Sequence, residues 1–396
     1  MLIAGEASGD MLGAELVQAL RKELTAAEVE YTADSQPLHT GLEPHFFGAG
    51  GPRMAAAGVE LAFDLTQYSI TGLPSPKEYL IGRRNFNHLL QLAIQRQPDV
   101  IVGIDYNYFN LRFAESIRRY TNRHSGWFQD WRPRLVKYIS PQLWASRESR
   151  AYAIARDFDL VLSIIPFEKA WYAKHAPKLR VEFVGHPMLD RLARSDVKPD
   201  SSTILLLPGS REGELKSHLP VILKALKLIR EKVPNVKAKV VVPTESLAQL
   251  ARSLGVDCEI QIGDLPQALA EATIAIASTG TVTMECAFFG LPTVTLYKKH
   301  LLGVALKIGL IKSKWFTMPD IIANEEVFPE FIQNAATPEN ISRAALALLQ
   351  DDPRRKAIQA KLAQVVASLG GPGASKRAAR AITELLEPRM NTNAHK

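Results

Sequence analysis

The sequence predicts an α/β protein with two doubly wound domains, each built on a parallel sheet. Short apolar segments alternate with helical segments along most of the chain, as is typical of parallel sheets with helices between the strands. The 396 residues exceed the usual size of one hydrophobic core. A stretch rich in Asp, Lys, Pro and Ser at residues 193–202 interrupts the alternation, and we expect the hinge between the domains there.

The first half opens on a strand, Leu2–Ala4, followed by a helix at residues 11–24 with apolar residues at helical spacing. Its clearest strand is PDVIVGI at 98–104, which follows an amphipathic helix at 83–96. The same alternation continues to the hinge. It predicts helices near 111–120, 148–156 and 167–175, and strands at 135–139, 160–165 and 181–184.

The second half repeats the pattern with strands at 204–207, 238–242, 258–262 and 274–277, and helices at 219–232, 246–254, 265–271 and 282–289. After the Gly-rich stretch 370–373, a last helix at 375–386 is long enough to return to the first domain. We therefore expect an N-terminal domain over 1–195, a C-terminal domain over 196–368 and a returning helix within 369–396.

Composition limits the class of protein. The contents of 46% hydrophobic and 22% charged residues are typical of a soluble globular chain. Cys258 and Cys286 form neither a disulfide framework nor a zinc spacing, and the histidines show no close ligand spacing, so we expect no metal. We find no secretory signal and no apolar run that spans a bilayer, and expect a cytoplasmic protein. The net charge of +7 favours an anionic partner.

A strand-to-helix turn at 204–215, ILLLPGSREGEL, is suited to hold phosphate. Gly209 allows the backbone to fold back, Ser210 is suited to cap the helix, and Arg211 lies where the first helical turn favours an anion. The alternative is an ordinary turn with an exposed arginine.

A second turn of similar character follows the strand at 274–277. It presents small hydroxyl residues and a glycine: Ser278, Thr279, Gly280 and Thr281. Glu285, about one helical turn further on, is placed to accept hydrogen bonds from a ribose diol, or is a solvated helix residue. Ligands of open α/β sheets bind beyond the carboxyl ends of the strands, where both turns lie.

The N-terminal half has its own dense turn, GEASGD at 5–10. Ser8 suits the tight turn, Asp10 suits an N-cap of the following helix, and Glu6 is left to face a cleft. A glycine turn, GAGGPR at 48–53, ends in Arg53, with a flexible loop as the alternative.

Asp105 ends the strongest strand of the first half and precedes an unusual stretch, YNYFN. At the carboxyl end of a buried parallel strand, desolvation raises the pKa of an acid toward a value useful to a general base. The alternatives are a helix N-cap or a structural hydrogen-bond acceptor.

Eight motifs occur in an order that resembles the lipid-A-disaccharide synthase family. They are GEASGD at 5–10, GGPRM at 50–54, PDVIVGID at 98–105, ISPQLWASR at 139–147, PFE at 166–168, VGHPMLD at 184–190, LPGSREGE at 207–214 and STGTVTMECA at 278–287. The resemblance implies a fold of the GT-B type, with two Rossmann-like domains facing across a cleft. It further implies an inverting glycosyltransferase that joins UDP-2,3-diacylglucosamine to 2,3-diacylglucosamine 1-phosphate, with no cofactor.

By this resemblance, Asp105 is the general base, with Glu6 the second choice, and Arg211 stabilises charge on the departing UDP. The donor site comprises Gly209, Ser210, Arg211, Ser278, Thr279, Gly280, Thr281 and Glu285. The possible acceptor-binding residues are Ser8, Asp10, Arg53, Asn110 and His186, although a lone histidine is also a common packing residue.

The chain departs from the family pattern at several places, two of which lie at or near the candidate sites. Tyr106, Asn107 and Tyr108 follow Asp105 where the family has Ala-Pro-Asp, so one acidic group is missing beside the base. Asp320 replaces the asparagine of a Leu-Pro-Asn motif, which exchanges an amide that donates for an acid that does not. Either departure would alter specificity or activity.

Diacylated substrates imply peripheral contact with an anionic membrane at the inner face of the inner membrane. The candidate segments are 77–92, in which Arg83, Arg84 and His88 accompany leucines, and 127–132, WFQDWR. No motif supports nucleic-acid binding, and the oligomeric state stays open. Two other functions also stay open: another UDP-sugar enzyme, such as a cell-wall lipid precursor transferase or an epimerase, and a non-catalytic nucleotide-sugar or lipid-binding relative.

Overall fold

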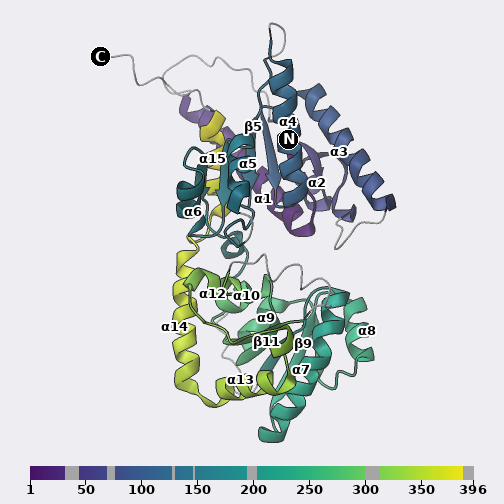
Figure 1. The fold of residues 1–396 in the computed structure, drawn as a ribbon, viewed down its shortest axis with the longest axis vertical. Coiled ribbons are helices and arrows are strands. Elements are labelled where there is room, and N and C mark those ends of the chain that lie inside the picture. The colour runs from purple at the N-terminus through teal and green to yellow at the C-terminus, as the bar shows by residue number, and fades with distance from the viewer. Residues whose placement is uncertain are drawn as a thin grey trace, which may run out of the picture. The chain divides into compact units, whose positions relative to one another are not determined.

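The computed structural model describes residues 1–31, 44–68, 76–126, 130–145, 148–193, 203–298 and 313–386 (Figure 1). The chain divides into two compact units. The first comprises Met1–Leu143, Arg147–Asp190 and Gly370–Lys396, and the second comprises Trp144–Ser146 and Arg191–Leu369. Each unit has its own parallel sheet with helices between the strands, which confirms the predicted α/β fold class.

The sheet of the first unit has seven strands in the order β3-β2-β1-β4-β5-β6-β7, and neighbouring strands run parallel. Its strands are β1 (Leu2–Ala4), β2 (Phe47–Gly50), β3 (Glu60–Asp64), β4 (Val100–Ile104), β5 (Arg134–Tyr138), β6 (Leu160–Ser163) and β7 (Arg180–Phe183). The strand order reverses between β1 and β4. Ligand sites of doubly wound sheets lie beyond the carboxyl ends of the strands at such a reversal.

Helices cover both faces of this sheet because alternate strand residues point to opposite sides. In β1, Ile3 packs in one hydrophobic cluster with residues of α4 and α5, whereas Leu2 and Ala4 pack in another with residues of α1 and α15. The helices of this unit are α1 (Ala7–Tyr31), α2 (Pro52–Ala56), α3 (Pro76–Arg96), α4 (Asn107–His124), α5 (Ala151–Asp157), α6 (Glu168–His175) and α15 (Ala374–Leu386), with 3-10 turns at Thr66–Tyr68, Glu148–Arg150 and Pro187–Asp190.

The last helix, α15, packs against α1 in the first unit, at the other end of the sequence (Figure 1). The Asp190 carboxylate fixes its start by accepting hydrogen bonds from the amides of Gly373 and Ala374, the latter at 3.0 Å. Arg377 then donates to the main-chain oxygen of Val184 at 2.7 Å. These contacts tie the C-terminal helix to the segment that precedes residue 190.

The sheet of the second unit has six parallel strands in the order β10-β9-β8-β11-β12-β13. They are β8 (Thr203–Leu207), β9 (Lys237–Val242), β10 (Glu259–Ile262), β11 (Ile274–Ser278), β12 (Thr293–Tyr297) and β13 (Glu330–Ile332). The helices are α7 (Glu212–Lys232), α8 (Glu245–Ser253), α9 (Leu265–Glu271), α10 (Val282–Phe288), α12 (Met318–Ala323), α13 (Pro338–Gln350) and α14 (Asp352–Ser368), with a 3-10 turn at Gln333–Ala335. Here the order reverses between β8 and β11.

Several elements differ from the sequence predictions at their ends. Helix α1 begins at Ala7 rather than 11, and α7 begins at Glu212 rather than 219, although a proline, Pro220, lies inside it. The prediction of a glycine turn at 48–53 is wrong for residues 48–50, which belong to β2. Gly48 has φ 151°, and a Cβ there would lie 1.9 Å from the main-chain oxygen of Leu2, so β2 passes β1 too closely for a side chain.

Strand β3 was not predicted, because its residues are exposed or half-buried at the sheet edge and form no clear apolar run. Among the helices that the structure describes, none combines the length and the apolar character that crossing a bilayer requires.

Candidate functional site

The strand reversal in the first unit brings Glu6 and Asp105 to one edge of its sheet. Ala4 pairs with Ile104, so the chain leaves β1 and β4 side by side. The ring of Tyr106 lies against Gly5, where a Cβ would be 2.4 Å from the ring carbons. Burial, and then the charge of Glu6, raise the pKa of Tyr106. The structure therefore gathers both predicted carboxylates at this edge, around the Tyr106 ring.

Asp105 ends β4 in an unusual backbone conformation. Its φ is 44° and that of Tyr106 is 39°, both in the left-handed region that costs residues with side chains free energy. The N-cap of α4 is Tyr106, so the alternative that Asp105 caps this helix is wrong. In the described part of the structure no hydrogen bond engages the half-buried Asp105 carboxylate, which is available to a ligand.

The backbone of Asp105 is held by three neighbours. Its amide donates to the oxygen of Tyr138 at 2.9 Å. Its own oxygen accepts hydrogen bonds from Asn110 Nδ2 at 3.0 Å and from Lys137 Nζ at 2.5 Å. Lys137 is a site residue that the sequence did not predict, and its one signal is a lysine between apolar residues of β5.

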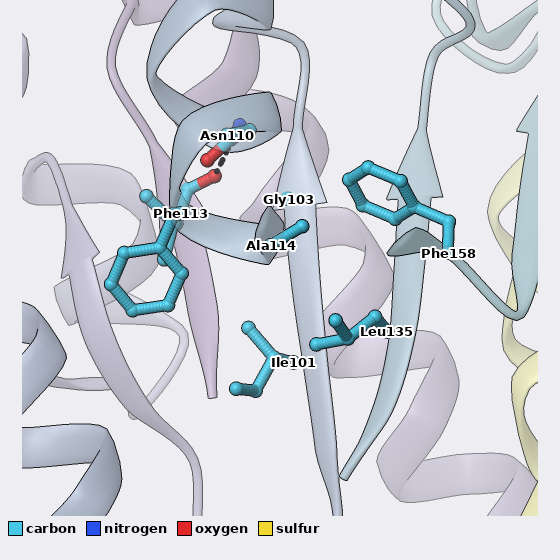
Figure 2. A pocket seen from close by; sticks show the side chains of 8 residues that line it. Ile101, Gly103, Asn110, Phe113, Ala114, Leu135 and Phe158 are labelled. Atoms are coloured by element: carbon cyan, nitrogen blue, oxygen red, sulfur yellow. Dashed lines mark hydrogen bonds between the residues drawn. The ribbon is translucent and has the colours of Figure 1, made fainter. Parts of the chain in front are cut away.

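Asn110 serves the backbone rather than a substrate. The side chain is buried, and Nδ2 also donates to the oxygen of Ile104 at 3.2 Å. Figure 2 shows it beside Gly103, where a Cβ would lie 2.9 Å from its side chain. The adjoining cavity is about 10 Å³ and lined mostly by apolar residues, too small for a sugar. The prediction that Asn110 contacts the acceptor directly is corrected accordingly.

Asp10 also has a structural role that the sequence did not predict. Its buried carboxylate accepts hydrogen bonds from the amides of Gly51 (2.8 Å), Arg53 (3.0 Å) and Met54 (3.0 Å), at the start of α2. It is not the N-cap of its own helix, which begins at Ala7. Asp10 thus fixes the backbone of Arg53, whose side chain is exposed, as is that of Ser8.

His186 is half-buried at the end of the first unit's main segment. Its Nδ1 atom accepts a hydrogen bond of 3.2 Å from the amide of Met188. In the neutral ring this contact assigns the proton to Nε2.

In the second unit, the Pro-Gly-Ser turn follows β8 as predicted. Gly209 has φ 128°, and a Cβ there would lie 2.6 Å from the Glu214 side chain. The N-cap of α7 is Arg211, so the prediction that Ser210 caps the helix is wrong. Instead, the Ser210 amide donates to the Glu214 carboxylate at 3.1 Å, and the exposed Arg211 guanidinium lies 3.8 Å from that carboxylate. An amide and a guanidinium thus converge on one carboxylate.

The second predicted turn lies at the same sheet edge, because β11 pairs with β8 and Ala277 is opposite Leu207. Gly280 and Thr281 are exposed, whereas Ser278 is buried. Glu285 is half-buried, and burial raises its pKa, opposed by the charge of Arg191. The structure therefore brings the two turns together at the strand reversal of this unit, with Glu285 on the helix that follows.

His218 links this edge to the next strand and was not predicted. Buried within α7, its Nδ1 lies 2.8 Å from the oxygen of Pro208, and its Nε2 accepts a hydrogen bond of 3.0 Å from the Lys298 amide. The two contacts require a neutral ring with the proton on Nδ1. Burial lowers the pKa of His218, which favours that form.

The structure changes the interpretation of Asp320. Its buried Oδ1 accepts hydrogen bonds from the amides of Val327 (3.2 Å) and Phe328 (3.0 Å), and its Oδ2 is enclosed without a donor. Burial and the neighbouring Glu330 carboxylate raise the pKa of Asp320 to about 8. This shift favours the protonated acid, which like an amide has a hydrogen to donate, and so changes the expectation that this acid cannot donate.

The first predicted membrane segment, 77–92, lies in α3. In α3, Tyr79 and Leu80 are 56% and 63% exposed near the exposed Arg83 and Arg84. Leu89 is fully buried, so that part of the segment belongs to the core. Residues 127–129 of the other segment lie outside the described residues.

A search of the described ranges for three or more His, Cys, Asp or Glu side chains able to hold a metal ion finds none. Each unit has its own candidate site at one sheet edge, beside the strand reversal of that sheet. One carries carboxylates and the other carries a glycine turn, an arginine and hydroxyl groups.

Comparisons with known proteins show which family this chain is similar to. The family model described as lipid-A-disaccharide synthetase matches residues 1–385. The lipid-A-disaccharide synthase of Chromohalobacter salexigens is 35% identical over 407 residues, covering 97% of this chain and 96% of the relative. Another, from Syntrophus aciditrophicus, is 34% identical, covering 96% of this chain and 95% of the relative.

Among solved structures, a putative UDP-N-acetylglucosamine 2-epimerase from Listeria monocytogenes aligns with a TM-score of 0.59 at 14% identity, covering 97% of this chain and 95% of that one. The likeness at this identity supports the fold alone.

Proposed function

Because this chain belongs to the lipid-A-disaccharide synthetase family and is a glycosyltransferase of lipid A biosynthesis, we propose that it joins UDP-2,3-diacylglucosamine to 2,3-diacylglucosamine 1-phosphate. The match over nearly the whole chain is the observation that carries this proposal. The products are a β-1,6-linked disaccharide 1-phosphate and UDP.

In this reaction the 6-hydroxyl oxygen of the acceptor attacks the anomeric carbon of the donor. The bond from that carbon to the diphosphate oxygen breaks, and its electron pair leaves with UDP. The hydroxyl proton passes to the Asp105 carboxylate, with Glu6 as the second choice for this role. A free, half-buried carboxylate at a strand end supports the assignment of Asp105.

Arg211 and the Ser210 amide are proposed to bind the diphosphate and stabilise its growing charge. Their convergence on the Glu214 carboxylate supports this role, because a phosphate offers the same kind of oxygen acceptor. The hydroxyl turn at Ser278–Thr281 completes the phosphate contacts, and Glu285 binds the ribose. Ser8, Arg53 and His186 are proposed to bind the acceptor, with Asp10 acting through the backbone of Arg53.

The enzyme is proposed to work at the cytoplasmic face of the inner membrane. The exposed Tyr79 and Leu80, close to Arg83 and Arg84, provide apolar contact beside positive charge. Co-sedimentation with vesicles containing anionic lipid tests this contact. We expect the double variant Tyr79→Ser/Leu80→Ser to lose binding. The control Tyr152→Ser, which changes another exposed tyrosine, should bind as the wild type does.

A coupled assay that follows UDP release tests the reaction itself. We expect Asp105→Ala and Arg211→Ala to lose at least about a hundredfold in kcat/KM. Thin-layer chromatography of the lipid product separates transfer from epimerisation, because an epimerase converts the UDP-sugar without an acceptor. A UDP-sugar converted with no acceptor present, or undiminished turnover in Asp105→Ala, would contradict the proposal.

A further inference from the structure

The two left-handed residues Asp105 and Tyr106 need neighbours that hold them in place. Both carry side chains, and both have a φ near 40° (44° and 39°). Such a conformation persists where the surroundings over-determine it. The main-chain oxygen of Asp105, which lies between the two residues, receives hydrogen bonds from Asn110 and Lys137.

Lys137 is completely buried in β5, next to the central strand β4, and its amino group reaches the carboxyl end of β4. Besides the contact of 2.5 Å to the Asp105 oxygen, Nζ lies 3.4 Å from the oxygens of Gly103 and Tyr138. Three carbonyl oxygens match the three donors of an ammonium group. Buried lysines are rare, because losing water costs the charged form a large free energy.

We propose that Lys137 is a positioning residue for sugar transfer, which holds the Asp105 backbone and, when protonated, carries a positive charge near the base. The inference rests on the proposed role of Asp105 and adds a residue to it. Lys137 contacts carbonyl oxygens of the protein, so its contribution passes through Asp105.

The charged groups around Lys137 act on the pKa of its amino group. Burial lowers the pKa of Lys137 to about 7, and the charge of Asp105 opposes this shift. On the neighbouring elements, Glu168 accepts a hydrogen bond from Ser163, and Glu6 acts on Tyr106. Among these described groups, Asp105 is therefore the charged group that acts on Lys137.

Two substitutions separate the two contributions. Lys137→Met fills the space but neither donates nor carries charge, whereas Lys137→Gln donates without charge. We expect Lys137→Met to lower kcat at least about tenfold with little change in KM, and to move the acidic limb of the pH profile up by about one unit. Lys137→Gln should recover part of kcat, but the acidic limb of its pH profile should stay as displaced as in Lys137→Met. Lys174→Met, which changes an exposed lysine of α6, is the control.

If Asp105→Ala is inactive but Lys137→Met has the kcat and the acidic limb of the wild type, the inference is overturned. An active Asp105→Ala would instead overturn the proposed function. Should the lysine variants fail to fold, NMR titration of lysines labelled at Cε answers the question in the folded wild type and Asp105→Asn. Because the interaction between two sites is reciprocal, Asp105→Asn should lower the pKa of Lys137 by about one unit. An unchanged pKa would refute the inference.

Discussion

The ring of His218 connects two loops of the second unit, with Nδ1 2.8 Å from the oxygen of Pro208 and Nε2 3.0 Å from the amide nitrogen of Lys298. Pro208 directly precedes the glycine turn proposed to bind the diphosphate, and Lys298 follows β12. One buried, neutral ring thus fixes the position of the glycine turn relative to the end of β12.

Replacing this ring should weaken both folding and UDP binding. His218→Phe keeps the ring volume but leaves the buried Pro208 oxygen unpaired, which costs about 1–3 kcal/mol, and also removes the acceptor of the part-buried Lys298 amide. The pKa of His218 is lowered from 6.5 in the fold, so the unfolded chain binds the extra proton first. Wild-type stability should therefore fall as the pH drops below 6.5, and the variant should lose this part of the dependence. Urea unfolding of the wild type and the variant between pH 5 and 8 measures the loss of stability and its dependence on pH. The same change of stability with pH in both proteins would contradict the assignment of His218.

Asp320 should make the second unit less stable as the pH rises. Its pKa is raised from 3.8 to about 8 in the fold, so between these values the native state holds a proton that the unfolded chain has lost. The free energy of unfolding should decline by up to about 4 kcal/mol between pH 5 and 8. Asp320→Asn should remove most of this decline and keep its activity. The control is Glu325→Gln, which changes an exposed acid, and a decline that persists in Asp320→Asn would argue against a protonated Asp320.

Asp10→Ala should destabilise the first unit by about 2–4 kcal/mol, because three amides at the start of α2 lose a charged acceptor. Ser8→Ala, a change of an exposed side chain in the same turn, should cost less than about 0.5 kcal/mol. Chemical denaturation of the purified variants provides the measurement. Similar stabilities for both variants would mean that the carboxylate does not hold α2.

Gly209→Ala should reduce UDP affinity at least about tenfold. The added Cβ meets Glu214 at 2.6 Å, in a left-handed conformation that disfavours alanine, so the turn has to shift. Gly213→Ala is a matched control, because a Cβ there has no neighbour within 4 Å and the residue lies inside α7. Calorimetric titration with UDP compares the two, and unchanged affinity in Gly209→Ala would show that the turn does not contact the nucleotide.

Local sequence signals predicted most strands well because buried parallel strands are short apolar runs. Val100–Ile104 and Ile274–Ser278 are examples, each within two residues of the prediction. Helix starts were predicted less well. The first two turns of α7 contain one apolar residue before 219, Leu215, which is too few to show the helical period.

The sequence by itself determined the fold class, the family and the two turns at strand ends, because each depends on residue types and their local order. The tertiary structure decided which strand ends meet, since strand order comes from pairing between distant segments. It also decided what Asp10, Asn110, Lys137 and Asp320 do. Their roles depend on burial and on partners far along the chain, such as Arg53 for Asp10 and Asp105 for Lys137, and these partners exist only in the folded protein.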